Sequence, residues 1–174
     1  MVETTHPSMA DATRVFERPA GVVEIRELHP REAAIVRLAV PPDDLPKAVP
    51  EALAEVAQAM ETAGVELAGP PYTRYVEWGP DGVIAEIGFP VLRPAPRIGR
   101  VGPGRLPGGR VASIVHIGPY ETLADTYGRL ERRLAELGHG DLGPMWECYW
   151  SDPESEPDPS TWRTEILTPI ESQD

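Results

Sequence analysis

The feature that most constrains the fold of this chain is an internal repeat. Three short segments of the first half recur, in the same order, in the second half. They are Ile35-Val36 with Ile114-Val115, Gly69-Pro70 with Gly143-Pro144, and Ala85-Glu86-Ile87 with Thr164-Glu165-Ile166. The first and third matches lie 79 positions apart (35 to 114), and the second lies 74 apart (69 to 143). Such a repeat predicts two similar units, related by a pseudo-twofold axis, that share one core.

Within the first unit, the hydrophobic pattern predicts strands around a helix. Short apolar or alternating segments predict strands, and apolar residues spaced three and four apart predict a helix. The predicted elements are strands over 22–28, 33–39, 72–78 and 83–89 and a helix over 45–63. Asp43-Asp44 is expected to supply the N-cap of this helix and Gly64 to end it.

The second unit repeats this plan. Its predicted elements are strands over 111–116, 145–150 and 162–170, a helix over 123–137, and a short irregular strand near 100–101 and 105–106. We therefore predict an α+β fold in which two pseudo-symmetric β-α-β-β repeats form one concave antiparallel sheet with two helices packed behind it. Residues 1–20 are expected to be a disordered tail. Residues 21–170 are expected to form a single domain, with repeats over 21–98 and 99–170.

Composition argues against several classes of function. The formal net charge of −12 argues against direct binding to nucleic acid, whose phosphates attract a basic surface. A single cysteine excludes an internal disulfide, and the four histidines are scattered, so we expect no metal and no cofactor. No apolar run approaches the ~20 residues of a membrane span, and the first residues lack a signal-peptide core. We therefore expect no membrane contact and a cytoplasmic location.

The strand Met145-Trp146-Glu147-Cys148-Tyr149-Trp150 carries the strongest candidate for a functional site. Alternation places Glu147 and Tyr149 on one face and the residues between and beside them on the other. Because an unpaired carboxylate is costly to bury in an apolar core, we place Glu147 at the floor of an aromatic-walled pocket. The alternative is a salt bridge from Glu147 to Arg74 or Arg163. Cys148 is expected to be a small buried apolar residue.

The repeat also predicts what lies beside Glu147. Thr73 corresponds to Glu147 and Tyr75 to Tyr149, so the two middle strands should meet with these four side chains on one face. Tyrosine rings stack on ligands and hold cations, and their hydroxyls donate hydrogen bonds. The predicted ligand-binding residues are Glu147, Tyr149, Tyr75, Tyr120, Trp146, Phe89 and Trp162.

Other residues of this region have a structural interpretation. Strict alternation turns several aromatic residues toward the helices or leaves them at strand ends, namely Tyr72, Trp78, Trp146 and Trp150. His116 ends a strand before a turn and is expected to cap the next helix, with a chemical role as the alternative. Glu86 and Glu165 occupy equivalent repeat positions and are expected to pair with strand arginines. A second acidic group in the pocket is the alternative for these glutamates.

The order and spacing of several motifs resemble a known family. The motifs are His116-Ile117-Gly118-Pro119-Tyr120-Glu121, Gly143-Pro144, Trp146-Glu147-Cys148-Tyr149, Asp152-Pro153, Thr164-Glu165 and Pro169-Ile170. Over residues 21–170 they resemble the GyrI-like small-molecule-binding family, the effector-binding domain of AraC- and MerR-type multidrug-responsive regulators. The resemblance implies a central cleft for lipophilic, often cationic molecules, with a glutamate at the position of Glu147. Since no helix-turn-helix segment is present, we expect a stand-alone form.

Two functions of different classes remain open. The first is a stand-alone protein that binds a lipophilic cationic or aromatic compound, for sequestration, sensing or resistance. The second, implied by stand-alone members of the family, is a hydrolase that opens strained cyclopropane rings of DNA-alkylating natural products. Glu147 would then activate water, and Tyr149 or Tyr75 would steady the leaving phenolate. A topoisomerase as protein partner, as for gyrase-modulating relatives, has no positive support in the residues.

Overall fold

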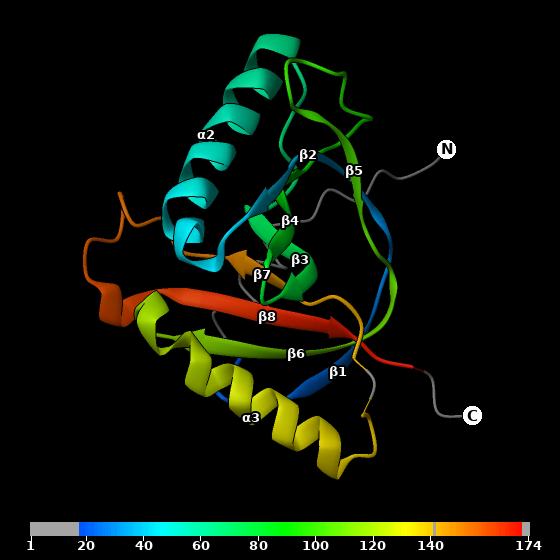
Figure 1. The fold of residues 1–174 in the computed structure, drawn as a ribbon, viewed down its shortest axis with the longest axis vertical. Helices are drawn as coiled ribbons and strands as arrows, with labels where there is room; N and C mark the ends of the chain where they lie inside the picture. The colour runs from blue at the N-terminus through cyan, green and yellow to red at the C-terminus, as the bar shows by residue number, and fades with distance from the viewer. Residues whose placement is uncertain (1–17, 141, 172–174) are drawn as a thin grey trace.

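The computed structural model describes residues 18–140 and 142–171 (Figure 1). Across this part of the chain, the strands form an eight-stranded antiparallel sheet in the order β1-β6-β8-β7-β3-β4-β2-β5. They are β1 (Glu24–Leu28), β2 (Arg31–Val40), β3 (Tyr72–Gly79), β4 (Gly82–Pro90), β5 (Gly102–Leu106), β6 (Gly109–Ile117), β7 (Trp146–Tyr149) and β8 (Arg163–Pro169). The helices are α2 (Leu45–Ala63), α3 (Leu123–Glu136) and the short 3-10 turns η1 (Pro42–Asp44), η2 (Tyr120–Thr122) and η3 (Pro159–Thr161). The tail predicted over 1–20 lies, as far as residue 17, outside the described residues.

The strand order is symmetric about the contact between β7 and β3. On one side β3 pairs with β4 and β4 with β2, and on the other side β7 pairs with β8 and β8 with β6. The edge strands cross over, since β1 precedes β2 in the chain but pairs with β6, whereas β5 precedes β6 but pairs with β2. The predicted α+β fold class, with one antiparallel sheet and two helices, is confirmed.

The helix α2 ends as predicted but begins differently. Gly64 ends it in the left-handed conformation, with φ of 68°. Asp44 occupies the predicted N-cap position, but its side chain makes no capping hydrogen bond. The reason is that η1 runs directly into α2, so Asp44 already has near-helical angles (φ −87°, ψ −10°), whereas a capping residue needs extended ones.

Both helices pack on the same face of the sheet. In Figure 1, α2 lies at the upper left and α3 at the bottom, on either side of the central strands. The two cores beneath them contain, among others, Val36, Ala85, Ile87, Ile114, Leu130 and Ile166. The opposite face holds a separate core that contains Tyr72, Trp146, Cys148 and Leu167. The expectation that the Trp146 face meets the helices is therefore wrong. The sheet is curled, and the side chains of this face pack against one another instead.

The strand glutamates pair with arginines, as predicted. Glu86 lies 2.9 Å from Arg74, and Glu165 lies 2.9 Å from Arg26. Both pairs lie on the face opposite the helices. The pair of Arg74 and Glu86 joins the neighbouring strands β3 and β4, whereas the pair of Arg26 and Glu165 joins β1 to β8 across β6. None of the helices in the described ranges combines the length and apolar composition that crossing a membrane requires.

His116 is buried and holds the start of α3. Its Nδ1 lies 2.7 Å from Thr126 Oγ1, and its Nε2 lies 3.0 Å from Thr122 Oγ1 and 3.1 Å from the carbonyl oxygen of Pro119. Both ring nitrogens are thus occupied by the turn and the first turns of the helix. His116 thus contacts the start of the helix, as expected, but through threonine hydroxyls and a carbonyl oxygen rather than by capping a backbone N–H. A chemical role stays a prediction.

Candidate functional site

Glu147 lies on β7 at the centre of the sheet, on the face that carries both helices. Its neighbours in register are Thr73 on β3 and Ile166 on β8. The residue is buried, with 6% of its surface exposed. Its carboxylate oxygens therefore depend on protein groups, rather than on bulk water, for hydrogen bonds.

Three tyrosine hydroxyls supply those hydrogen bonds. Tyr127 donates to Oε1 of Glu147 at 2.7 Å. Tyr149 and Tyr75 both donate to Oε2, at 2.9 Å and 3.2 Å. The Tyr149 hydroxyl also lies 2.8 Å from Thr73 Oγ1. Since each hydroxyl carries one proton, Thr73 donates to Tyr149 when Tyr149 donates to the carboxylate.

The repeat register predicted two of these tyrosines correctly. β3 and β7 pair so that Thr73 lies opposite Glu147, and the four side chains expected to share a face are joined by hydrogen bonds. Sequence reasoning missed Tyr127, which comes from α3 and follows the apolar spacing of that helix. A hydroxyl within a stripe otherwise made largely of leucine is the signal that identifies it, because a buried tyrosine hydroxyl needs a partner.

The alternative prediction, a salt bridge from Glu147 to an arginine, is wrong. Arg74 and Arg163 occupy strand positions whose side chains point to the face opposite the carboxylate. Arg74 forms its ion pair there with Glu86. The carboxylate is thus held by hydroxyl dipoles, which satisfy its oxygens without neutralising its charge.

Burial dominates the acid–base properties of this cluster. It raises the pKa of Glu147, although the hydrogen bonds from the three tyrosines oppose the shift. Burial and the nearby carboxylate also raise the pKa of the phenols of Tyr75, Tyr127 and Tyr149. The tyrosines are therefore neutral donors near neutral pH. Glu147 is a group that either a proton or a ligand cation would stabilise.

Two more of the predicted residues extend the cluster toward solvent. Tyr120 in η2 is 38% exposed, and burial of the rest of its ring raises its pKa. Its ring centroid lies 5.9 Å from that of Tyr149 and 5.0 Å from that of Trp162. A run of aromatic rings thus leads from the carboxylate to the surface.

Two predicted residues do not join this run. Trp146 is buried in the core of the opposite face, so the prediction that it lines the same pocket as Glu147 is wrong. The reason is that neighbours along a strand point to opposite faces. Phe89, like Tyr75, packs against the core beneath α2, and its contact with a ligand stays a prediction.

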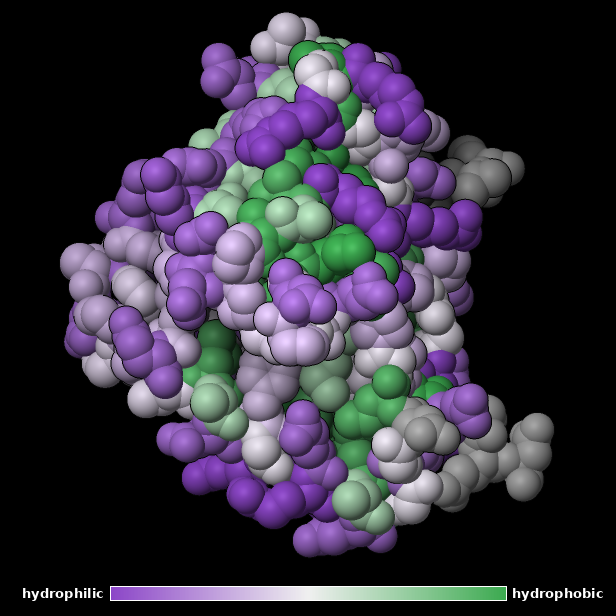
Figure 2. Space-filling view, in the orientation of Figure 1, coloured by the Kyte–Doolittle hydropathy of each residue, from purple (hydrophilic) through white to green (hydrophobic). Residues whose placement is uncertain are grey.

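The surface beside α2 carries an apolar patch. Figure 2 shows hydrophobic side chains gathered above the middle of this view, beside α2, with hydrophilic side chains around them. Within the described ranges, no three His, Cys, Asp or Glu side chains are grouped so as to hold a metal ion. The chemistry that the described site offers is a buried carboxylate among phenol rings, which can accept a cation or a proton.

Comparison with known proteins identifies a family model that covers most of the chain. The model describes a GyrI-like small molecule binding domain and matches residues 22–171. A comparison with curated proteins gives no match.

Solved structures that share the fold include the C-terminal domain of EcmrR, with a TM-score of 0.76 and 21% identity over 87% of this chain and 98% of that one. In the EcmrR–DNA complex, the matched region is 58% of the EcmrR chain. A hydrolase from Listeria innocua has a TM-score of 0.63 and 18% identity, over 94% of this chain and 98% of that one. SAV2435 bound to tetraphenylphosphonium has a TM-score of 0.57 and 11% identity, over 87% and 94%. At these identities the likeness concerns the fold.

Proposed function

Because the chain belongs to the GyrI-like small-molecule-binding domain family, we propose that it holds a lipophilic organic cation with aromatic groups against Glu147. One observation carries the proposal: a buried carboxylate whose hydrogen-bond donors are three neutral tyrosine hydroxyls. The hydroxyls satisfy the carboxylate oxygens but carry no positive charge, so this buried carboxylate is stabilised by a cation or by a proton. A ligand that carries one positive charge among apolar rings complements both the charge and the aromatic surface.

Entry of this ligand requires a local rearrangement. The hydroxyls of Tyr75, Tyr127 and Tyr149 enclose the carboxylate, so a cation that contacts it must turn at least one of these rings aside. A hydrogen bond to a charged group contributes about 1.5–3 kcal/mol. Pairing of a desolvated cation with the carboxylate contributes an amount of the same order or larger, so the exchange can favour binding.

A protein with the same fold supports the choice of ligand class. SAV2435 binds tetraphenylphosphonium, a cation whose charge is surrounded by four phenyl rings. At 11% identity, that protein supplies a suitable probe compound for this chain rather than its natural ligand.

Isothermal titration calorimetry with two aryl compounds tests the proposal. Tetraphenylphosphonium carries a charge, whereas triphenylphosphine oxide is neutral. Glu147→Gln keeps the shape of the side chain and removes its charge, so we expect it to weaken cation binding by about 2–5 kcal/mol and to leave the neutral compound unaffected. The matched control is Glu77→Gln, an exposed position on β3 that changes the net charge equally. Equal cation binding by wild type and Glu147→Gln would contradict the proposal.

Hydrolysis is a second candidate. The raised pKa of Glu147 beside tyrosine hydroxyls favours it, because a carboxylate of raised pKa accepts a proton from water and a phenol can donate to a leaving phenolate. Water would attack a cyclopropane carbon, the strained C–C bond would break, and its electron pair would pass into the conjugated ring system. The likeness in fold to the Listeria innocua hydrolase adds support.

Mass spectrometry separates the two candidates. A cyclopropane-bearing electrophile is incubated with substoichiometric protein. A water-added product that accumulates beyond one equivalent, and is absent with Glu147→Gln, would establish hydrolysis. Retention of the unchanged compound would favour binding alone.

We also propose that the residues of this chain bind no nucleic acid by themselves. The net charge of −12 repels phosphates. Because EcmrR occurs in a DNA complex, the proposal is tested directly by a gel shift with duplex DNA at low salt. A salt-sensitive shift would contradict it.

A further inference from the structure

A β-bulge turns Trp78 onto the face that carries the tyrosine cluster. The register of β3 with β4 shifts between Tyr75 and Glu77. Before the shift Tyr75 lies opposite Ala85, and after it Trp78 lies opposite Val83. Ala85 and Val83 are two positions apart on β4 and share a face, so Tyr75 and Trp78 share that face too. In a regular strand, residues three apart would point to opposite faces.

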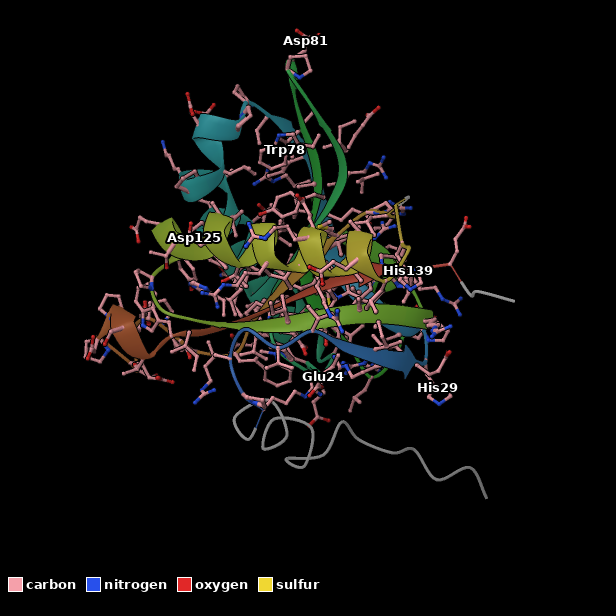
Figure 3. The ribbon with its side chains drawn as sticks, turned by 90° about the horizontal axis from the view of Figure 1, so that it is seen from below. Glu24, His29, Trp78, Asp81, Asp125 and His139 are labelled. Atoms are coloured by element: carbon pink, nitrogen blue, oxygen red, sulfur yellow. The ribbon has the colours of Figure 1, made fainter. Side chains whose placement is uncertain are left out.

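Trp78 is both exposed and in contact with the cluster. Its ring centroid lies 5.4 Å from that of Tyr75 in an edge-on arrangement, with an interplanar angle of 72°. Tyr75 in turn donates to Glu147, so one ring separates the indole from the carboxylate. Trp78 is nevertheless 61% exposed. In Figure 3 the hairpin of β3 and β4 rises beyond α3, with Asp81 at its tip and Trp78 on its flank.

The indole of Trp78 and the ring of Tyr75 thus form a second run of aromatic rings beside the carboxylate. Tyr75 and Tyr149 lie on opposite sides of the Thr73–Glu147 pair, because β3 and β7 are antiparallel and each tyrosine follows its pair member by two residues. Two aromatic runs therefore leave the carboxylate in opposite directions. One consists of Tyr75 and Trp78, and the other of Tyr149, Tyr120 and Trp162.

We propose that Trp78 contacts the ligand directly and selects for cations that carry more than one aryl group. This inference rests on the proposed binding function and deepens it. A cation with a single ring, seated at Glu147, can cover one run of rings. A cation with several rings can cover both, remove the indole of Trp78 from water and gain a cation–π contact with it.

The test compares tetraphenylphosphonium with phenyltrimethylammonium, which has one ring. We expect Trp78→Ala to weaken binding of tetraphenylphosphonium about two- to fivefold, the effect of one cation–π contact at an exposed site, and to weaken binding of phenyltrimethylammonium less, because its single ring can use the other run. Trp78→Phe should lie between Trp78→Ala and wild type, since it keeps a ring. The matched control is Ile25→Ala, at an apolar position 39% exposed on the distant edge strand β1, and it should bind like wild type.

The outcomes separate this inference from the function on which it rests. If Trp78→Ala binds tetraphenylphosphonium like wild type while Glu147→Gln weakens it, the role of Trp78 is refuted and the binding function stands. If Trp78→Ala weakens both compounds equally, selection by aryl number is refuted. If wild type and Glu147→Gln bind tetraphenylphosphonium alike, the proposed function fails and this inference fails with it. Equal thermal midpoints for Trp78→Ala and wild type show that the fold is intact.

Discussion

Replacing Tyr127 with phenylalanine distinguishes the two oxygens of the Glu147 carboxylate. Tyr127 is the tyrosine that donates to Oε1, whereas Oε2 receives both Tyr149 and Tyr75. Phenylalanine keeps the ring that packs against the core beneath α3 and removes only the hydroxyl. Tyr127→Phe therefore deprives one oxygen of its tyrosine donor, while Tyr75→Phe leaves the other oxygen bonded to Tyr149.

The expected losses follow from the charge of the acceptor. A hydrogen bond contributes about 1.5–3 kcal/mol when its acceptor is charged and about 0.5–1.5 kcal/mol when both groups are neutral. Tyr127→Phe should therefore lower the free energy of unfolding by about 1.5–3 kcal/mol when Glu147 is ionised and by about 0.5–1.5 kcal/mol when it is protonated. Tyr75→Phe should lower it by about 0.5–1.5 kcal/mol, because its 3.2 Å bond is long and Tyr149 remains.

Urea unfolding over a series from about pH 4 to about pH 9, followed by tryptophan fluorescence, measures these losses. Each tyrosine variant is compared in the wild-type and Glu147→Gln backgrounds. In the Glu147→Gln background, Tyr127→Phe and Tyr75→Phe should lower the free energy of unfolding by similar amounts. The Tyr127→Phe loss should therefore be about 1 kcal/mol or more smaller there than in the wild-type background, and this difference is the coupling free energy between Tyr127 and Glu147. Equal losses for the two variants at every pH, or an unchanged Tyr127→Phe loss in the Glu147→Gln background, would refute the reasoning.

Three further predictions follow from the burial and close packing of residues in the sheet. Because burial raises the pKa of Glu147, stability present while it is protonated is lost as pH rises through the folded pKa. Glu147→Gln should then gain stability relative to wild type in urea unfolding as pH rises, and a constant difference would contradict this. Burial also raises the pKa of the Cys148 thiol, so a thiol reagent at about pH 8 should label only unfolded chains, and immediate labelling of native protein would argue against it. Gly88→Ala should lower the free energy of unfolding by about 1–3 kcal/mol or more, because its Cβ would lie 1.8 Å from the carbonyl oxygen of Ala34; a wild-type thermal midpoint would exclude this.

Much of the fold could be predicted from local pattern and internal repetition. The spacing of apolar residues and a following glycine located α2 over Leu45–Ala63. The repeat register paired β3 with β7 and brought Thr73 opposite Glu147. Both inferences rest on periods that most residues of an element obey, and the paired residues of β3 and β7 lie before the irregular position in β3.

The remainder depends on features that no period encodes. The bulge after Tyr75 adds one residue to β3 and thereby reverses the face of Trp78, which strict alternation assigns to the other side. Alternation placed Trp146 on the face opposite Glu147, but whether that face meets the helices could not be predicted, because alternation does not say which face of a sheet the helices cover. Tyr127 follows the apolar spacing of α3, and only the tertiary contact with Glu147 reveals its second role.

The choice of partners around Glu147 is the strongest physical argument that the carboxylate serves a ligand. If Glu147 only stabilised the sheet, we would expect an arginine or lysine to neutralise its charge. Alternatively, an apolar residue of similar volume at position 147 would avoid the desolvation cost of a buried charge. Three tyrosine hydroxyls do neither. They satisfy the carboxylate oxygens without adding a positive charge, and their aromatic rings surround the carboxylate. A cation that displaces one hydroxyl therefore loses one hydrogen bond and gains a charge pair in surroundings of low polarity, which favours cations over neutral compounds of the same shape.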